Sequence, residues 1–312
     1  MTLGIEVRNL QLRYGETVAL HDLDFDLPGG KIYGLLGRNG SGKTSLLSAL
    51  AGFHKPGAGT VRIGGQPVFE NPHITRQVCL IRESGGVGDK TDSLKDTLHI
   101  AASLRPGWDA GYAAKLVELF GLPLGKKLGE LSRGQRSAFG VAVGLAARTP
   151  VTMFDEAHLG MDAPSRQAFQ DELLRDFMAN PRTIIISTHL IEEQSPLFEQ
   201  VLILREGRLL LHEELDDLRS RGVSVTGPAD AVDTFVAGLT VLGEQQLGRT
   251  KSAMLYGALD DTRRRAAREA GLDLGPVALQ DLFTHLTQPT RLTQPTGPAQ
   301  PTGPAQPTGA AT

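Results

Sequence analysis

The sequence predicts an α/β fold in which a mainly parallel sheet is flanked by helices. Before residue 218, short apolar runs alternate with helical segments, which is the pattern of strands joined by helical crossovers. A glycine-rich phosphate-binding pattern follows one of these runs and opens a helix. The N-terminal segment instead alternates apolar and polar residues, which predicts a half-buried antiparallel sheet. The predicted strands of the parallel sheet are residues 32–36, 78–81, 151–154, 183–187 and 201–204.

Composition divides the chain into three parts. Residues 1–218 carry the alternation of strands and helices, with a helical region inserted at about 84–130. Residues 219–285 suggest a small α+β appendage. Residues 286–312 are rich in Pro, Thr and Gly and lack the apolar side chains of a core, so we expect a disordered tail. A ligand for proline-recognition domains is the less favoured alternative, because basic and aromatic flanks are missing.

Composition also excludes several classes of protein. The 312 residues include 40% hydrophobic and 21% charged residues, so a wholly disordered or fibrous chain is a poor fit. A single cysteine rules out an intramolecular disulfide framework, and a net charge of -3 gives no global reason to expect nucleic acid. The longest apolar stretch, residues 138–147, is far shorter than the ~20 residues that span a bilayer. The N-terminus lacks the apolar run of a secretory signal.

The most specific local motif is the P-loop pattern of residues 37–44, between an apolar strand and a helix-forming segment. Its glycines let consecutive backbone N–H groups point at phosphate oxygens, and the helix N-terminus adds a favourable dipole. Lys43 is expected to neutralise the β- and γ-phosphates, and Thr44 to offer a hydroxyl to Mg²⁺. The predicted phosphate-binding residues are Gly37, Asn39, Gly40, Ser41, Gly42, Lys43, Thr44 and Ser45.

An acidic pair, Asp155 and Glu156, follows the apolar strand 151–154. Ligands bind at the carboxyl ends of strands in open α/β sheets. Asp155 is therefore expected to help hold Mg²⁺, and Glu156 to orient or deprotonate an attacking water. The alternative is that the pair only caps the next helix.

Three further segments resemble motifs of ATP-binding-cassette (ABC) ATPases. Residues 131–135 (Leu-Ser-Arg-Gly-Gln) resemble the signature motif, residues 160–162 the D-loop, and residues 187–189 the switch segment with its histidine. With the P-loop and the acidic pair, the resemblance covers about residues 3–218. It implies a P-loop NTPase core with an N-terminal antiparallel β subdomain and an inserted helical subdomain. It also implies ATP hydrolysis with Mg²⁺, with Glu156, His189 and Lys43 as catalytic residues.

The signature motif further implies a second nucleotide-binding subunit. Ser132 stands where a helix N-cap belongs, so its hydroxyl and the nearby amides offer an anion site; ordinary capping is the alternative. In the family, this helix start faces the γ-phosphate held by the P-loop of another subunit. One copy completes no site, so we expect a homodimer or pairing with a close paralogue. The residues expected to contact nucleotide across that dimer are Ser132, Gly134, Gln135 and Asp162.

Two more residues receive roles from the resemblance. Tyr14 stands where family members place an aromatic residue that stacks on adenine; filling the core is the alternative. His189 is expected to hydrogen-bond the γ-phosphate, with the start of a helix as its alternative role.

Three positions depart from the family pattern. Glu83 occupies the Q-loop position, where glutamine is usual, and is our candidate third metal ligand beside Thr44 and Asp155; a solvated loop residue is the alternative. Arg133 replaces the usual second glycine of the signature. His158 and the preceding Ala157 replace a small hydroxyl residue and a proline, which leaves the local backbone geometry open.

The resemblance favours an ATP-hydrolysing subunit of a membrane transporter, which works through separate permease subunits on the inner face of the cell membrane. The rival class is a soluble cassette ATPase that acts on nucleic acid or ribosomes. Only 86 residues separate Thr44 from Leu131, without sustained heptads, and the chain has a single cassette; both points favour transport. Residues 277–283 resemble a closing motif of bacterial export subunits, which favours export, although an amphipathic helix that packs on the appendage is the alternative.

Overall fold

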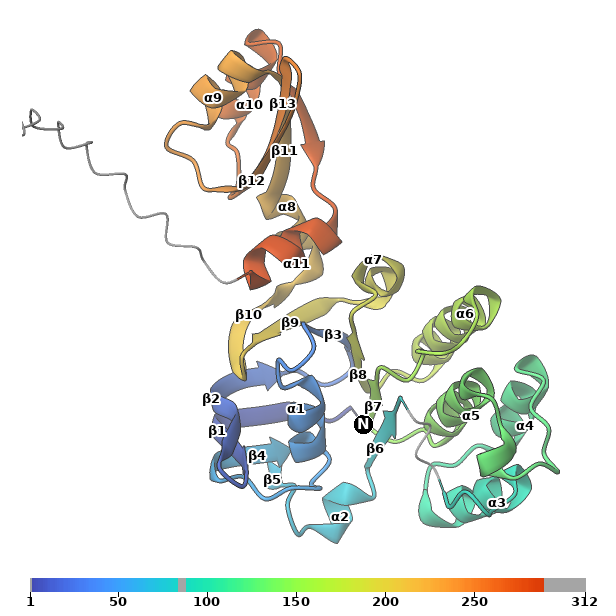
Figure 1. Ribbon diagram of the computed structural model, residues 1–312. Helices are drawn as coiled ribbons and strands as arrows, with labels where there is room; N and C mark the ends of the chain where they lie inside the picture. The colour runs from blue at the N-terminus through green and yellow to red at the C-terminus, as the bar shows by residue number, and fades with distance from the viewer. Residues whose placement is uncertain (1, 84–87, 289–312) are drawn as a thin grey trace, which may run out of the picture.

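The computed structural model describes residues 2–83 and 88–288, and within these residues the strands form three sheets (Figure 1). The first is an antiparallel N-terminal sheet in the order β2-β1-β4-β5. Along its strands, buried residues alternate with more exposed ones, and inward-facing Val7 and Leu23 are fully buried. The predicted antiparallel sheet is confirmed. Its strands are β1 (Ile5–Tyr14), β2 (Thr17–Leu27), β4 (Ala58–Ile63) and β5 (Gln66–Pro67).

The second sheet has the order β10-β9-β3-β8-β7-β6. All neighbouring pairs among β9, β3, β8, β7 and β6 are parallel, and β10 runs antiparallel to β9. The prediction of an α/β fold with a mainly parallel sheet is therefore confirmed. These strands are β3 (Ile32–Gly37), β6 (Val78–Arg82), β7 (Val151–Asp155), β8 (Thr183–Thr188), β9 (Gln200–Arg205) and β10 (Arg208–Glu214).

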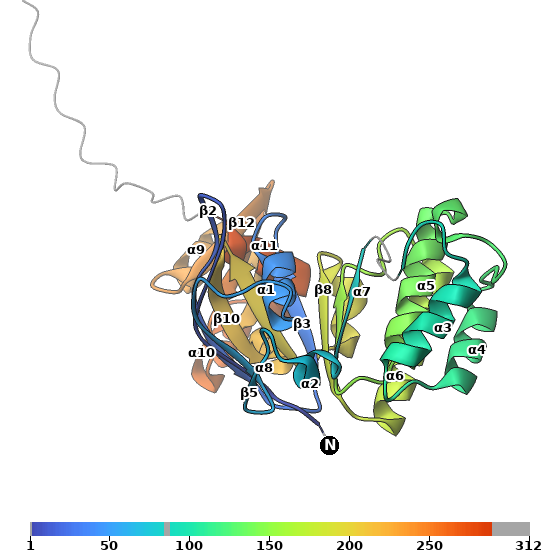
Figure 2. The same cartoon turned by 90° about the horizontal axis from the view of Figure 1, so that it is seen from below.

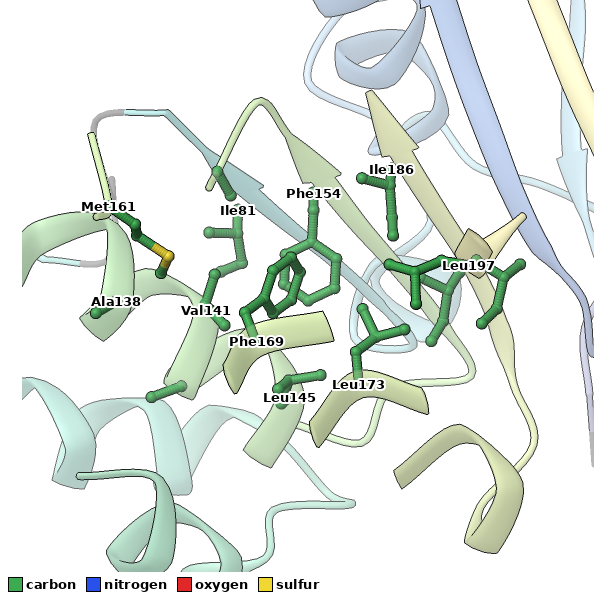
Figure 3. Close-up of a cluster of buried hydrophobic side chains, with 14 of the residues drawn as sticks. Ile81, Ala138, Val141, Leu145, Phe154, Met161, Phe169, Leu173, Ile186 and Leu197 are labelled. Carbon is green, nitrogen blue, oxygen red and sulfur yellow. The ribbon is translucent and has the colours of Figure 1, made fainter. Parts of the chain in front are cut away.

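Helices cover both faces of this central sheet (Figure 2). On one face, α1 packs between the central and N-terminal sheets. On the other face, α5 and α6 enclose an apolar cluster in which the rings of Phe154 and Phe169 meet edge to face at 5.4 Å (Figure 3). Beyond them lies the helical region that was predicted at about 84–130. The helices up to β9 are α1 (Lys43–Leu50), α2 (Pro72–Thr75), α3 (Leu94–Leu104), α4 (Ala110–Leu119), η1 (Leu128–Glu130), α5 (Arg133–Ala146), α6 (Ala163–Ala179), α7 (Ile191–Gln194) and η2 (Ser195–Leu197).

The third sheet, β12-β13-β11-β14, is antiparallel and has its own buried cluster under α9 and α10. The predicted boundary at residue 218 lies inside α8, because Leu215 and Leu218 are buried in the cluster of the central sheet. The elements of this part are α8 (Leu215–Arg221), β11 (Gly222–Pro228), α9 (Ala229–Val236), β12 (Val241–Leu247), β13 (Thr250–Tyr256), α10 (Asp261–Glu269), β14 (Asp273–Pro276) and α11 (Leu279–Thr287).

The C-terminal helix α11 corrects two predictions. It continues to Thr287, so placing the tail from residue 286 onward was wrong for its first residues. It also packs on more than the appendage: Leu282 and Phe283 join the cluster of the central sheet, and the backbone N–H of Gln280 donates to Glu192 Oε1 of α7 at 2.8 Å. The rest of the predicted tail, residues 289–312, lies outside the described residues. Among the residues described, none of the helices has the length and apolar character needed to cross a bilayer.

Candidate functional site

The P-loop follows the carboxyl end of β3 and leads into α1. Gly40 and Gly42 have φ angles of 79° and 103°, which L side chains rarely adopt, so glycine permits this turn. Lys43 is buried, and its Nζ donates to the backbone oxygens of Gly37 at 2.8 Å and Arg38 at 3.4 Å. The ammonium group of Lys43 therefore holds the loop in place through two of its carbonyl oxygens.

The loop fits a phosphate group. A Cβ added at Gly42 would lie 2.9 Å from Leu20 Cδ2 and 3.1 Å from the carbonyl oxygen of Ala19, so β2 packs this closely against the loop only with glycine there. The Oγ of Ser41 is buried, with no hydrogen-bond partner among the residues that the structure describes. A phosphate oxygen would satisfy this hydroxyl and the N–H groups at the helix start.

The acidic pair lies at the carboxyl end of β7, where Ser187 of β8 fixes both residues. Its hydroxyl donates to Asp155 Oδ1 at 2.6 Å and accepts from the backbone N–H of Glu156 at 3.0 Å. Glu156 has a φ of 50°, in the left-handed region. The next helix, α6, is capped by Asp162 instead, so the alternative role of the acidic pair in capping is wrong.

Glu156 joins the P-loop to the switch histidine. Its Oε1 lies 3.4 Å from Lys43 Nζ, and its Oε2 lies 3.2 Å from His189 Nδ1. His189 follows β8 and is partly exposed, whereas Lys43 is buried. These two contacts orient the Glu156 carboxylate, and an oriented carboxylate beside the phosphate-binding loop can accept a proton from a bound water.

A cavity of about 720 Å³ collects most of the predicted residues. P-loop residues form one wall, and Asp155, Glu156 and Glu83 face them. A second cavity of about 690 Å³ lies on the other side of the P-loop, between Gly37, His189 and helix α11. The predicted residues that line the first cavity are Asn39, Gly40, Ser41, Gly42, Lys43, Thr44, Ser45, Glu83, Asp155 and Glu156.

The signature and D-loop residues do not line the nucleotide cavity. Ser132 caps α5 as expected: its Oγ accepts from the N–H of Gln135, and the Gln135 side chain accepts from the N–H of Ser132, both at 3.1 Å. Asp162 caps α6, and hydrogen bonds from the hydroxyl and amide of Ser165 lower the pKa of its carboxyl. A Cβ added at Gly134 would lie 2.7 Å from the carbonyl oxygen of Gly160, so the two loops touch closely.

Tyr14 is not a core residue. Its side chain is 42% exposed at the end of β1, and its ring meets the ring of His54 edge to face at 5.1 Å. The alternative that Tyr14 fills the core is therefore wrong. It lies outside the lining of the nucleotide cavity.

The residues that depart from the family pattern make specific contacts in the structure. Glu83 forms an ion pair with Arg133 of the signature. His158 is fully buried, and its Nε2 lies 3.1 Å from the hydroxyl of Thr188, next to His189. Burial lowers the pKa of His158 to about 4, so its imidazole is neutral at pH 7.

Sequence reasoning missed several residues of the site. Thr17, Val18, Ala19 and His21 of β2 line the nucleotide cavity together with the turn at Glu206 and Gly207. That turn is tied to the P-loop because the N–H of Gly207 donates to the carbonyl oxygen of Ser41 at 3.0 Å. The Glu-Gly pair between two apolar runs was a usable turn signal. Ser187, a hydroxyl residue inside a buried strand, was another.

Comparisons with known proteins agree with this geometry. Residues 20–158 match the family model described as ABC transporter. The bacitracin transport ATP-binding protein BcrA of Enterococcus faecalis is 31% identical over 72% of this chain and 74% of its own length. The Nod factor export ATP-binding protein I of Burkholderia lata is 33% identical over 65% and 68%. A sulfate/thiosulfate import ATP-binding protein, CysA of Caulobacter vibrioides, is 33% identical over 66% and 63%.

Solved structures show the same fold. An ATP-binding subunit of an ABC transporter superposes with a TM-score of 0.62 at 25% identity and covers 69% of this chain and 91% of its own. An ATP-binding cassette in a dimeric post-hydrolysis state, bound to ADP and phosphate, has a TM-score of 0.60 at 20% identity and covers 68% and 98%. The P-loop NTPase fold is therefore confirmed. The chain belongs to the ABC transporter family as an ATP-binding subunit, and like the members of that family it is an ATPase.

Proposed function

We propose that this chain powers an exporter, and that ATP binding closes a dimer coupled to separate membrane-spanning subunits. The observation that carries the proposal is that Glu156 contacts both Lys43 and His189 beside the P-loop. These groups come from the carboxyl ends of three neighbouring parallel strands. Hydrolysis on such an edge depends on positioning and charge stabilisation.

Each residue at this edge has a role toward ATP. The P-loop amides and Lys43 bind the phosphates, and Tyr14 stacks on the adenine. Thr44, Asp155 and Glu83 line one cavity and offer only oxygen ligands, which suits Mg²⁺. The bound ion would neutralise phosphate charge. Glu156 accepts the proton of the attacking water, and His189 holds the γ-phosphate side of the site.

Dimer closure completes each site with groups from the other subunit. Ser132, Gly134, Gln135 and Asp162 lie outside the lining of the nucleotide cavity of their own chain. The start of α5 offers the backbone amides of its first turn and the positive end of the helix dipole, which together favour an anion. A second copy of the chain, or a close paralogue, would bring this helix start to the γ-phosphate.

The permease partners and the direction of transport belong to the same proposal, and three observations support them. Two of the relatives above are named for bacitracin transport and Nod factor export. Residues 277–283, which lead into α11, resemble a closing motif of bacterial export subunits. The helical region would contact the permease on the inner face of the membrane. An action on nucleic acid or ribosomes is not favoured, because these relatives are transport proteins.

The substitution Glu156→Gln tests the catalytic role. We expect ATP binding to persist, turnover to fall about 10²- to 10⁴-fold, and an ATP-bound dimer to accumulate, because only activation of water is lost. ATPase rate and particle mass are measured on the same sample. Glu118→Gln, an exposed glutamate on α4, is the control. Normal turnover in Glu156→Gln would contradict the assignment.

Affinity purification of the full chain from detergent-solubilised membranes tests the partner. We expect a membrane-spanning protein in stoichiometric amount. Recovery of ribosomes or nucleic acid in its place would support the rival class.

A further inference from the structure

Two of the departures from the family pattern contact each other. Glu83 follows β6, and Arg133 is the first residue of α5, fifty positions later in the chain, yet their side chains form an ion pair. A glutamine at position 83 has no charge to pair, and a glycine at position 133 has no side chain. The ion pair therefore requires both departures from the family pattern, since each residue supplies the charge that pairs with the other.

Glu83 stands between two cavities. It lines the nucleotide cavity with Thr44 and Asp155, the candidate metal ligands. It also lines a cavity of about 450 Å³ whose wall includes the arginines Arg82, Arg133 and Arg136. Thr44 and Asp155 line this arginine-rich cavity as well. One carboxylate thus has a cationic partner on one side and a metal position on the other.

The stem of Arg133 extends this connection to the D-loop. A Cβ added at Gly160 would lie 2.7 Å from Arg133 Cγ, so the stem packs directly on that glycine. Arg133 thereby joins Glu83, the start of α5 and the D-loop within one subunit. The side chains of Arg133 and Glu83 are 63% and 46% exposed, and ion pairs this exposed are weak because water screens them. Such a pair is easily exchanged for a divalent cation.

We propose that the Glu83 carboxylate has two exclusive partners: Arg133 in the nucleotide-free subunit and the Mg²⁺ of bound ATP in the loaded subunit. Loading then releases the Arg133 guanidinium at the start of α5, where the signature is proposed to meet the second subunit. This inference depends on the proposed function, because it requires Mg²⁺·ATP at the P-loop. It makes Arg133 a competitor of the metal for one carboxylate.

A double-mutant cycle on the full chain tests the competition. Binding of a fluorescent, non-hydrolysable ATP analogue is followed while Mg²⁺ is titrated, and the half-saturating Mg²⁺ concentration is the readout. Arg133→Gln should lower this concentration about two- to fivefold when position 83 is Glu, because the metal no longer displaces an arginine. The same change in the Glu83→Gln background should shift it much less, because the carboxylate is gone.

Three further proteins make the result specific. Arg133→Lys keeps a cation and should stay within about twofold of the parent protein. Arg133→Ala repeats the neutralisation, so that the comparison does not depend on how one side chain packs against Gly160. Asp26→Asn removes the partner of Arg8 in a similarly exposed pair on the N-terminal sheet and should leave the Mg²⁺ titration unchanged.

Equal shifts from Arg133→Gln in both backgrounds would overturn the inference, because a general loss of positive charge would then explain them. The inference is also overturned if Arg133→Lys shifts the half-saturating Mg²⁺ concentration as much as Arg133→Gln does, because the charge of residue 133 would then not matter. Failure of the unsubstituted chain to bind the analogue at any Mg²⁺ concentration would instead contradict the proposed function. The two failures are therefore distinguishable.

Discussion

The nucleotide edge (Lys43, Asp155, Glu156 and His189) and the signature loop (residues 131–135) differ most in how they are held. Lys43 and Asp155 are 6% and 5% exposed and bond to groups of their own chain, whereas Arg133 at the signature is 63% exposed. Buried contacts fix Lys43 and Asp155 before nucleotide binds. Ser132 and Arg133 of the signature loop are exposed, and in the proposed function their contribution to catalysis depends on a second subunit. Substitutions at the edge should therefore affect a single subunit, and those at the signature loop should affect the pair.

The largest effect is expected from Phe154→Ala in the core behind the acidic pair. Phe154 is fully buried against Phe169, so its loss leaves a cavity and should lower the free energy of unfolding by about 3–5 kcal/mol. Urea unfolding followed by the fluorescence of Trp108, the single tryptophan of the chain, measures the loss. Phe53→Ala makes the same change at a ring that is 57% exposed and should cost less than about 1 kcal/mol. Equal losses would contradict the view that burial fixes this edge.

The pH dependence of stability at the buried His158 gives a second test of how burial fixes the nucleotide edge. Its pKa falls from 6.5 to about 4 on folding, because burial disfavours the imidazolium. The unfolded chain then binds the extra proton, so stability is full above pH 6.5 and declines as pH falls toward 4, by up to ~3 kcal/mol. His158→Gln should flatten this part of the stability curve, and His99→Gln, at an exposed site on α3, should not. Urea midpoints measured at several pH values test this expectation. If the stability curves of His158→Gln and the parent protein run parallel, His158 is not the source of the pH dependence.

The smallest stability effect is expected at the signature loop itself. Ser132→Ala removes the N-cap of α5 and should cost about 1 kcal/mol, while ATP binding by the single subunit stays within about twofold. Ser93→Ala removes the equivalent cap of α3 and is the matched control. Both variants should lose similar stability in urea, but only Ser132→Ala should weaken ATP-dependent dimerisation, measured by particle mass. Equal dimerisation in the two variants would show that Ser132 is only a cap.

Much of the fold and of the nucleotide edge was predictable because their signals are local. Each predicted parallel strand is an apolar run that lies within the observed strand and is one or two residues shorter than it. The P-loop glycines allow the backbone angles that the loop requires. The start of the tail was placed at residue 286, inside α11, although Leu279, Leu282, Phe283 and Leu286 repeat at helical spacing. The proline-rich composition that follows outweighed that repeat.

The rest depended on contacts between distant segments. The pairing of Glu83 with Arg133 joins the end of β6 to the start of α5, which only folding brings together. His158 was left without a role because its partner, the hydroxyl of Thr188 in β8, lies thirty positions later in the chain. The contact of α11 with Glu192 of α7 likewise crosses eighty-eight positions. Such contacts follow from the topology of the sheets and have no local pattern in the sequence.

In the proposed function two subunits share each ATP site, and mixing two inactive variants is the sharpest test of this sharing. Lys43→Ala damages the P-loop and Ser132→Arg the signature, so each protein alone has a lesion in both sites of its dimer. The mixture should regain ATP-dependent dimerisation, because one of its two sites combines an intact P-loop with an intact signature. Mixing Lys43→Ala with the double variant Lys43→Ala/Ser132→Arg should regain nothing. Absence of rescue in the first mixture, with both proteins folded, would contradict the shared site.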